Sequence, residues 1–287
     1  MRHHQIAADD GEPLHLYQTG SGTPILLLHG WTTSHAAWSP LLSPLTSQSD
    51  GKVCLLRPDA RGHGGHVLQV DPAPNLRRLA RDVINLLDHL KIERVAAVGH
   101  SMGALTLWQC IRDFGTARFS HLALIDQSPK LTTDASWQGG IYGDFDAARS
   151  QRFIAEMHVD FAEAVLRLSA LSLNDRARDT FTRNTSGWRA ARMALESFDP
   201  PPLIAIWQSL VAADLRQVLP DIDVPTLLAY GSQSNFYTVA TAQYVAQHIP
   251  QANLSLYEGA DHCPHLAQPD RFAGELLAML NPLDRQG

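Results

Sequence analysis

The chain has 287 residues, with 23 basic and 29 acidic side chains, a formal net charge of −6, 45% apolar residues and 18% charged residues. These values exclude a disordered or fibrous protein, and the chain is long enough to close over one main core that carries an insertion. Because the sequence has no basic excess, we expect neither a nucleic acid partner nor binding to an anionic membrane surface.

The N-terminal segment 1–17 lacks the apolar stretch of a signal peptide. No stretch of the sequence approaches the roughly 20 apolar residues that a membrane span requires. We therefore expect a cytoplasmic protein that does not cross a membrane.

Cysteines and histidines give no metal or disulfide pattern. The three cysteines are Cys54, Cys110 and Cys263. Their odd number and wide spacing predict reduced thiols rather than a disulfide framework or a zinc site. Two close histidine pairs are His63 with His66 and His262 with His265. Neither pair has the HExxH pattern, so we expect no bound metal.

In the first half of the chain, short apolar runs alternate with helical periodicity, which is typical of a parallel sheet with helices on its faces. Four aliphatic runs predict buried strands, at 25–28, 53–56, 95–98 and 122–125. Between the second and third runs, apolar residues from Leu76 to Leu90 fall on one face at helical spacing. With Asn75 as a candidate N-cap, this segment predicts a crossover helix.

In the second half, the pattern is helical and rich in aromatic residues from about 144 to 215. Strands are then predicted at 226–230 and 253–257, with a helix at about 237–249 between them and a last helix at 269–280. A helical block between two parts of one sheet predicts a cap inserted into an α/β core. We place the core at 1–130 and 220–287 and the cap at 131–219, and this cap could supply a homodimer surface.

A glycine-flanked serine follows the predicted strand 95–98. Gly99, Ser101 and Gly103 form a GxSxG pattern between that strand and a helical segment. A serine held on such a sharp turn needs glycine two positions to either side, so that strand and helix can approach closely. Ser101 is therefore the candidate nucleophile, presented to a cleft at the carboxyl end of the strand.

Three motifs, GHSMG at 99–103, HGW at 29–31 and DARGHG at 59–64, resemble those of the α/β-hydrolase superfamily. The resemblance spans essentially the whole chain outside the cap. It implies an α/β-hydrolase fold and a serine hydrolase activity. It also implies an oxyanion hole formed by the backbone N–H groups of Trp31 and Met102. For the turn from Arg61 to Gly64 we favour a structural role.

A serine hydroxyl needs a neighbouring base near neutral pH, and histidine suits that task. After the last predicted strand, His262 follows Gly259 by three positions, which resembles the histidine loop of the superfamily and selects His262. His265 is the competitor, interpreted as a supporting or cap-facing residue. His100 is interpreted as a packed residue at the start of a helix.

The position of the candidate catalytic acid differs from the common superfamily pattern. That pattern places a carboxylate in a G-x-x-D turn after the strand 226–230, but the turn 231–234 reads Gly-Ser-Gln-Ser, and no Asp or Glu lies between Asp223 and Glu258. Asp126, at the end of the strand 122–125, is our candidate acid, a position that certain dehalogenases and lactonases of the superfamily use. The alternatives are a structural role for Asp126, as the cap of its turn, and Asp261 as the acid.

The combination of a candidate nucleophile, base and acid predicts hydrolysis through an acyl-enzyme, without a cofactor. The expected substrate is a carboxylic ester, lactone or thioester of a moderately apolar small molecule. Two alternatives remain open. One is a cofactor-free dioxygenase of an N-heteroaromatic ring, because such enzymes resemble this fold and pair a histidine base with an aspartate after the same strand. The other is a non-catalytic ligand-binding protein on a hydrolase scaffold.

Overall fold

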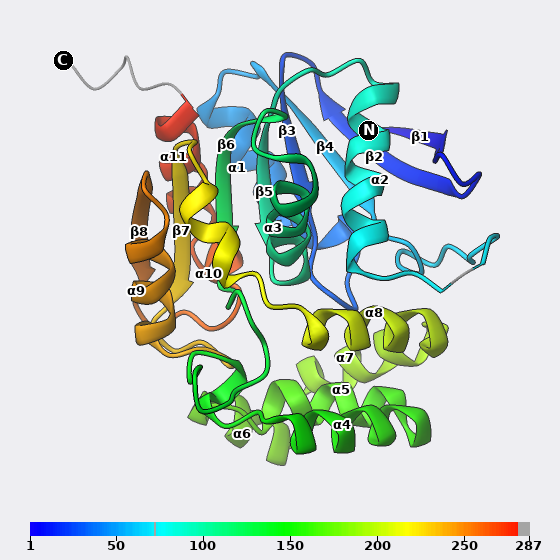
Figure 1. The fold of residues 1–287 in the computed structure, drawn as a ribbon, viewed down its shortest axis with the longest axis vertical. Coiled ribbons are helices and arrows are strands. Elements are labelled where there is room, and N and C mark those ends of the chain that lie inside the picture. The colour runs from blue at the N-terminus through cyan, green and yellow to red at the C-terminus, as the bar shows by residue number, and fades with distance from the viewer. Residues whose placement is uncertain (72, 281–287) are drawn as a thin grey trace.

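A computed structural model describes residues 1–71 and 73–280. Its centre is an eight-stranded sheet with the strand order β1-β2-β4-β3-β5-β6-β7-β8 (Figure 1). The strands are β1 (Arg2–Ala7), β2 (Pro13–Gly20), β3 (Thr23–Leu28), β4 (Val53–Asp59), β5 (Val95–His100), β6 (Phe119–Ile125), β7 (Thr226–Gly231) and β8 (Ala252–Tyr257). Strands β3 to β8 pair in parallel, whereas β1 and β2 pair antiparallel. The α/β fold class is thus confirmed.

All six predicted strands are present as β3 to β8. The hairpin of β1 and β2 was not predicted, because its strands bury few residues and carry many polar ones. In β1 only Ile6 is buried, so its sequence lacks the apolar run of a central strand. The hairpin is held instead by pairing with a strand far along the chain, since β2 pairs antiparallel with β4 and Leu16 lies opposite Pro58.

Helices cover both faces of the sheet, because successive residues of a buried strand point to opposite sides. Leu26 and Leu28 of β3 join a core with α2 (Leu76–His89), α3 (Met102–Phe114) and α9 (Val239–His248). Ile25 and Leu27 join a core with α1 (Ser39–Gln48) and α11 (Pro269–Leu280). Helix α2 begins as predicted, with the Asn75 side chain accepting a hydrogen bond from the Arg78 N–H at 3.0 Å.

Between β6 and β7 the chain forms the predicted helical block, which lies at one end of the sheet, below it in Figure 1. Its helices are α4 (Ala147–Val159), α5 (Phe161–Ala170), α6 (Asp175–Thr182), α7 (Ser186–Glu196) and α8 (Pro200–Ala212). Helix α10 (Pro264–Ala267) follows β8, and the 3-10 helices are η1 (His35–Trp38), η2 (Ile141–Gly143) and η3 (Arg216–Asp221). The domain limits at 131 and 219 stay a prediction.

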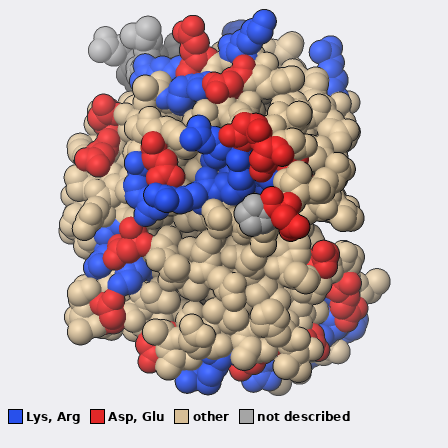
Figure 2. All heavy atoms as spheres, turned by 45° about the vertical axis from the view of Figure 1, so that its right-hand side comes forward, with Lys and Arg blue, Asp and Glu red and all other residues tan. Residues whose placement is uncertain are grey.

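Charged side chains of both signs lie next to one another on the face shown in Figure 2, beside a broad area without charge. The described residues include many ion pairs, among them Arg78 with Asp9 at 2.7 Å. Mixed charge of this kind produces no field of a single sign over the surface. None of the helices in the described part of the chain combines the length and the apolar character of a membrane span.

Candidate active site

Ser101 stands on a strained turn between β5 and α3. Its backbone has φ 54° and ψ −116°, a conformation that residues other than glycine rarely adopt. A Cβ atom on Gly99 would lie 2.5 Å from the carbonyl carbon of Gly103, and one on Gly103 would lie 2.1 Å from the carbonyl oxygen of Leu28. Both glycines are therefore required for β3, β5 and α3 to pack this closely around Ser101.

A cavity of about 200 Å³ lies at this turn, and Ser101 and His262 both line it. Trp31 and Met102, whose N–H groups were predicted as oxyanion donors, line the same cavity. The structure thus brings together four of the predicted residues from three distant segments. Their catalytic roles are treated below as proposals.

Asp126 lies beside His262, directly after β6. It is fully buried and has φ 45°. Its Oδ1 atom is 3.6 Å from His262 Nδ1, which is ion-pair range but longer than a hydrogen bond. Within the described residues, His262 Nδ1 has no hydrogen-bond partner. The Asp126 carboxylate thus lies within ion-pair range of the imidazole, without a hydrogen bond between them.

Two donors hold the Asp126 carboxylate from the neighbouring strand end. The Ser234 hydroxyl donates to Oδ1 at 2.9 Å, and the Gly231 N–H donates to Oδ2 at 3.3 Å. Burial raises the pKa of Asp126 above its ordinary value, although His262 and Ser234 act in the opposite direction. Sequence reasoning missed Ser234, but the signal was present, since a hydroxyl stands where the common pattern has the acid.

Asp261, the rival acid, is bonded within its own turn. It is exposed, and its Oδ1 atom accepts a hydrogen bond from the Cys263 N–H at 2.9 Å. The carboxylate thus stabilises its own turn, and its geometry gives no support to a role in orienting His262.

The loop of His262 is fixed through its backbone. The His262 N–H donates to Asn235 Oδ1 at 3.3 Å, and its carbonyl accepts a hydrogen bond from His100 Nε2 at 3.0 Å. Burial holds the pKa of His100 well below its ordinary value, so His100 is neutral and can donate from Nε2. His100 ends β5 and lines the cavity, so the interpretation of it as a packed residue at a helix start was incomplete.

His265 packs between η1 and α11 and not against the cap. It is buried, with its ring centroid 5.1 Å from that of Trp38 and 6.0 Å from that of Phe272. Burial lowers the pKa of His265 to about 3. The cap-facing interpretation was therefore wrong, because η1 and α11 enclose this side chain.

The turn after β3 packs directly on the serine. A Cβ atom on Gly30 would lie 3.4 Å from the Cβ atom of Ser101. Thr32, two positions after Gly30 in the same turn, donates its N–H to Nε2 of His63 at 3.2 Å. Burial lowers the pKa of His63 to about 3, so this histidine is neutral and accepts. The segment 59–64 thus holds the turn that carries the Trp31 amide.

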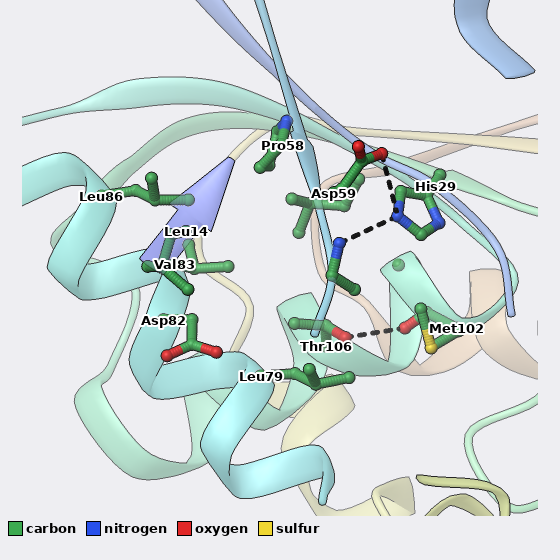
Figure 3. Close-up of a pocket in the computed structure, with 13 residues that line it drawn as sticks. Leu14, His29, Pro58, Asp59, Leu79, Asp82, Val83, Leu86, Met102 and Thr106 are labelled. Carbon is green, nitrogen blue, oxygen red and sulfur yellow. Dashed lines mark hydrogen bonds and ion pairs between the residues drawn. The ribbon is translucent and has the colours of Figure 1, made fainter. Parts of the chain in front are cut away.

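A second, smaller cavity of about 40 Å³ lies behind Met102, between β3, β4, α2 and α3 (Figure 3). Neither Ser101 nor His262 lines it. The polar groups there are paired internally, since His29 Nε2 accepts from the Ala60 N–H at 3.0 Å and Thr106 donates to the Met102 carbonyl at 2.9 Å. This cavity contributes to packing around the start of α3, not to a reaction site.

In the part of the chain that the structure describes, no three His, Cys, Asp or Glu side chains are grouped so that they could hold a metal ion. Burial raises the pKa of Cys263, which lines the larger cavity. Its thiol is consequently protonated and is a poor nucleophile.

The model of the alpha/beta hydrolase family matches residues 25–275. The chain belongs to this family. It is 30% identical to 3-oxoadipate enol-lactonase 1 of Acinetobacter baylyi over 84% of this chain and 82% of that protein. It is 24% identical to the pimeloyl-[acyl-carrier protein] methyl ester esterase of Vibrio vulnificus, over 92% and 97% of the two chains.

Among solved structures, the enol-lactonase of Burkholderia xenovorans superposes with a TM-score of 0.75 and 26% identity. The match covers 96% of this chain and 99% of that chain. Each of these matches therefore covers more than four fifths of this chain.

Proposed function

We propose that this protein is a carboxylic ester hydrolase that cleaves an ester, lactone or thioester of a moderately apolar small molecule through an acyl-enzyme. The observation that carries the proposal is the convergence of Ser101 and His262 on one cavity, with Asp126 at 3.6 Å from the imidazole. The relatives named as an enol-lactonase and a methyl ester esterase support the same class of bond.

The reaction begins with attack of Ser101 Oγ on the carbonyl carbon while His262 Nε2 takes the hydroxyl proton. The N–H groups of Trp31 and Met102 receive the oxyanion that forms. His262 then returns the proton to the leaving oxygen or sulfur, and the acyl group stays on Ser101. In the second half, His262 activates a water molecule, which releases the acid.

Asp126 acts through the histidine. By accepting a hydrogen bond from the Nδ1–H group, it fixes the tautomer that leaves Nε2 free as a base, and it stabilises the imidazolium formed during the reaction. The donors on Asp126 keep its oxygens pointing toward the imidazole. Asp126 is therefore proposed as a positioning carboxylate that is not itself protonated in the cycle.

The test is turnover of a 4-nitrophenyl ester by the wild type and by Ser101→Ala, with thermal unfolding as a control for folding. We expect kcat/KM to fall by at least about 10³-fold, while the unfolding midpoint stays close to that of the wild type. Turnover retained in Ser101→Ala would rule out the acyl-enzyme.

One observation also fits the dioxygenase alternative, namely the position of Asp126 after β6 rather than after β7. Oxygen consumption with a hydroxyquinolone separates the two reactions, because ester hydrolysis consumes no oxygen. A non-catalytic binding protein would form no covalent adduct with an organophosphonate. The homodimer stays a prediction, to be tested by the mass in solution.

A further inference from the structure

Gln127 brings a side-chain amide to the wall of the cavity at Ser101. It follows Asp126 after the end of β6, is 2% exposed and lines the cavity. The ends of β5 and β6 are held together here, because the Ser101 N–H donates to the Ile125 carbonyl at 3.2 Å. Two successive residues after β6 therefore have different surroundings: the carboxylate lies beside His262, and the amide lies at the cavity.

The orientation of this amide is set by its oxygen. The Ser128 N–H donates to Gln127 Oε1 at 2.7 Å, and the Tyr237 hydroxyl donates to the same atom. A backbone N–H group cannot accept a hydrogen bond, so the oxygen and not the NH2 group of the amide faces Ser128. Nε2 is consequently the end of the amide that these two neighbours do not engage.

The NH2 group of Gln127 is an unused donor. Among the described residues, the side-chain hydrogen bonds of Gln127 involve Oε1 alone. Nε2 is nevertheless not one of the unpaired polar atoms that are fully covered in that part of the chain, so it keeps accessible surface. Because the residue is otherwise buried and lines this cavity, that surface opens into the cavity.

Gln109 is the other buried glutamine of the described residues, and it provides a comparison. It lies on α3, its Nε2 atom donates to Asp113 Oδ2 at 2.7 Å, and it does not line the cavity. A buried glutamine that only supports packing thus has an acceptor for its amide within the protein. At Gln127 that acceptor has to come from a ligand.

The donor lies on the side of Ser101 opposite to the proposed oxyanion hole. In the sheet, β5 is flanked by β3 on one side and by β6 on the other. Trp31 comes after β3, whereas Gln127 comes after β6. An acceptor held by Gln127 is therefore not the carbonyl oxygen for which the Trp31 and Met102 N–H groups are proposed. It is a second acceptor on the same ligand.

We propose that Gln127 Nε2 selects substrates that carry a second hydrogen-bond acceptor, such as an ether or ketone oxygen, in addition to the reacting carbonyl. A substrate that covers Nε2 with a methylene group leaves a buried donor unpaired, which is the basis of discrimination at such a site. This inference rests on the proposed function, since it narrows the substrate class of the same site. It makes Gln127 a specificity-determining residue.

An oxygen scan of the substrate tests the proposal. In the acyl series, 4-nitrophenyl hexanoate is compared with the isosteres in which oxygen replaces carbon 3, 4 or 5 of the acyl chain. In the alcohol series, pentyl butanoate is compared with 2-ethoxyethyl and 3-methoxypropyl butanoate. For each oxygen analogue, kcat/KM is divided by that of its all-carbon parent, in the wild type and in Gln127→Met. The intrinsic reactivity of an ester is the same with both proteins and cancels in this comparison.

We expect the ratio for at least one analogue to be about tenfold higher in the wild type than in Gln127→Met. Gln109→Met is the matched control and should keep the wild-type ratios. The proposal is overturned if every ratio in Gln127→Met lies within about twofold of the wild type. A preference that Gln109→Met loses to the same extent would also overturn it, because the cause would then be packing.

Gln127→Glu guards against a variant that fails to fold. It keeps an acceptor for Ser128 and Tyr237 and replaces the NH2 group by oxygen. At pH 9, with the new carboxylate ionised, it has no donor and should lose the same preference as Gln127→Met. If Gln127→Met does not fold, a preference that persists in Gln127→Glu contradicts the proposal.

Binding of the same esters to Ser101→Ala, measured by calorimetry, separates this inference from the proposed function. We expect the preferred oxygen analogue to bind about tenfold more tightly than its parent, and the added Gln127→Met change to abolish the difference. If this holds while the wild type hydrolyses no ester, the ligand class stands and the hydrolase proposal fails. If the esters are hydrolysed through Ser101 and no ratio depends on Gln127, the hydrolase stands and this inference is wrong.

Discussion

The carboxyl ends of β6 and β7 are neighbours in the sheet but carry different chemistry. β6 is followed by the buried Asp126, whereas β7 is followed by the turn 231–234 that ends in Ser234. The Ser234 hydroxyl reaches back to Asp126 at 2.9 Å. In this chain the end of β6 supplies the carboxylate beside the imidazole, and the end of β7 supplies a hydroxyl that donates to it. We expect that a carboxylate from either strand end can serve, provided that its oxygen lies in the same place.

The strongest test of this comparison removes the charge at the end of β6. Asp126→Asn keeps the size of the side chain but cannot stabilise the imidazolium or fix the productive tautomer. We expect kcat for a 4-nitrophenyl ester to fall by about 10⁴-fold. Asp261→Asn is the control and should change kcat by less than about threefold. A loss under tenfold in Asp126→Asn would mean that another group is the acid.

An exchange of the two residues sharpens the comparison. In Asp126→Ser with Ser234→Asp, the carboxylate comes from the end of β7 and the hydroxyl from the end of β6. We expect the double variant to recover about 10²-fold in kcat over Asp126→Ser alone, because proximity of the carboxylate restores the orientation of His262. Circular dichroism controls for folding, and equal kcat in the single and double variants would contradict the idea that either strand can serve.

Removal of the supporting hydroxyl has a smaller effect. Ser234→Ala withdraws a group that lowers the pKa of Asp126, so the raised pKa of this carboxyl rises further. Asp126 then becomes protonated at a higher pH, so the acidic limb of the plot of kcat against pH shifts toward higher pH. We expect about a tenfold loss of kcat at pH 6 and a smaller loss at pH 8. Ser234→Thr keeps a hydroxyl and should restore the wild-type profile, whereas a loss independent of pH would point to a packing defect.

The smallest expected effect comes from loss of the hydrogen bond that fixes the backbone of His262. His100 donates to the His262 carbonyl, and His100→Phe removes that bond while it keeps a ring. We expect kcat to fall by about three- to tenfold. Because burial holds the pKa of His100 well below its ordinary value, the pH profile should keep its shape. A displaced profile would instead show that His100 itself titrates in the reaction.

Most of the core was predictable because its signals are local. The aliphatic runs of β3 to β8, the N-cap of α2 and the bounds of α11 all follow from neighbouring residues. The hairpin of β1 and β2 was not, since its stability comes from pairing with β4, far along the chain. Helix α1 was also missed, because Pro44 lies inside it and proline is a weak helix former in isolation.

The candidate site divides in the same way. Ser101 and His262 stand in motifs that resemble those of the superfamily, and the resemblance implies Asp126, because the usual position of the acid in the turn 231–234 has no carboxylate. Ser234 carries no motif. Its place beside Asp126 depends on the parallel pairing of β6 with β7. Such contacts join segments that are far apart in the sequence, so no local sequence pattern predicts them.

Labelling with a fluorophosphonate, followed by mass spectrometry, tests the central claim most directly. The wild type should carry one adduct, on the peptide that contains Ser101, and Asp126→Asn should react at least about 10³-fold more slowly at the same residue. An adduct on another residue, no adduct, or an equal rate in Asp126→Asn would contradict the account of this site.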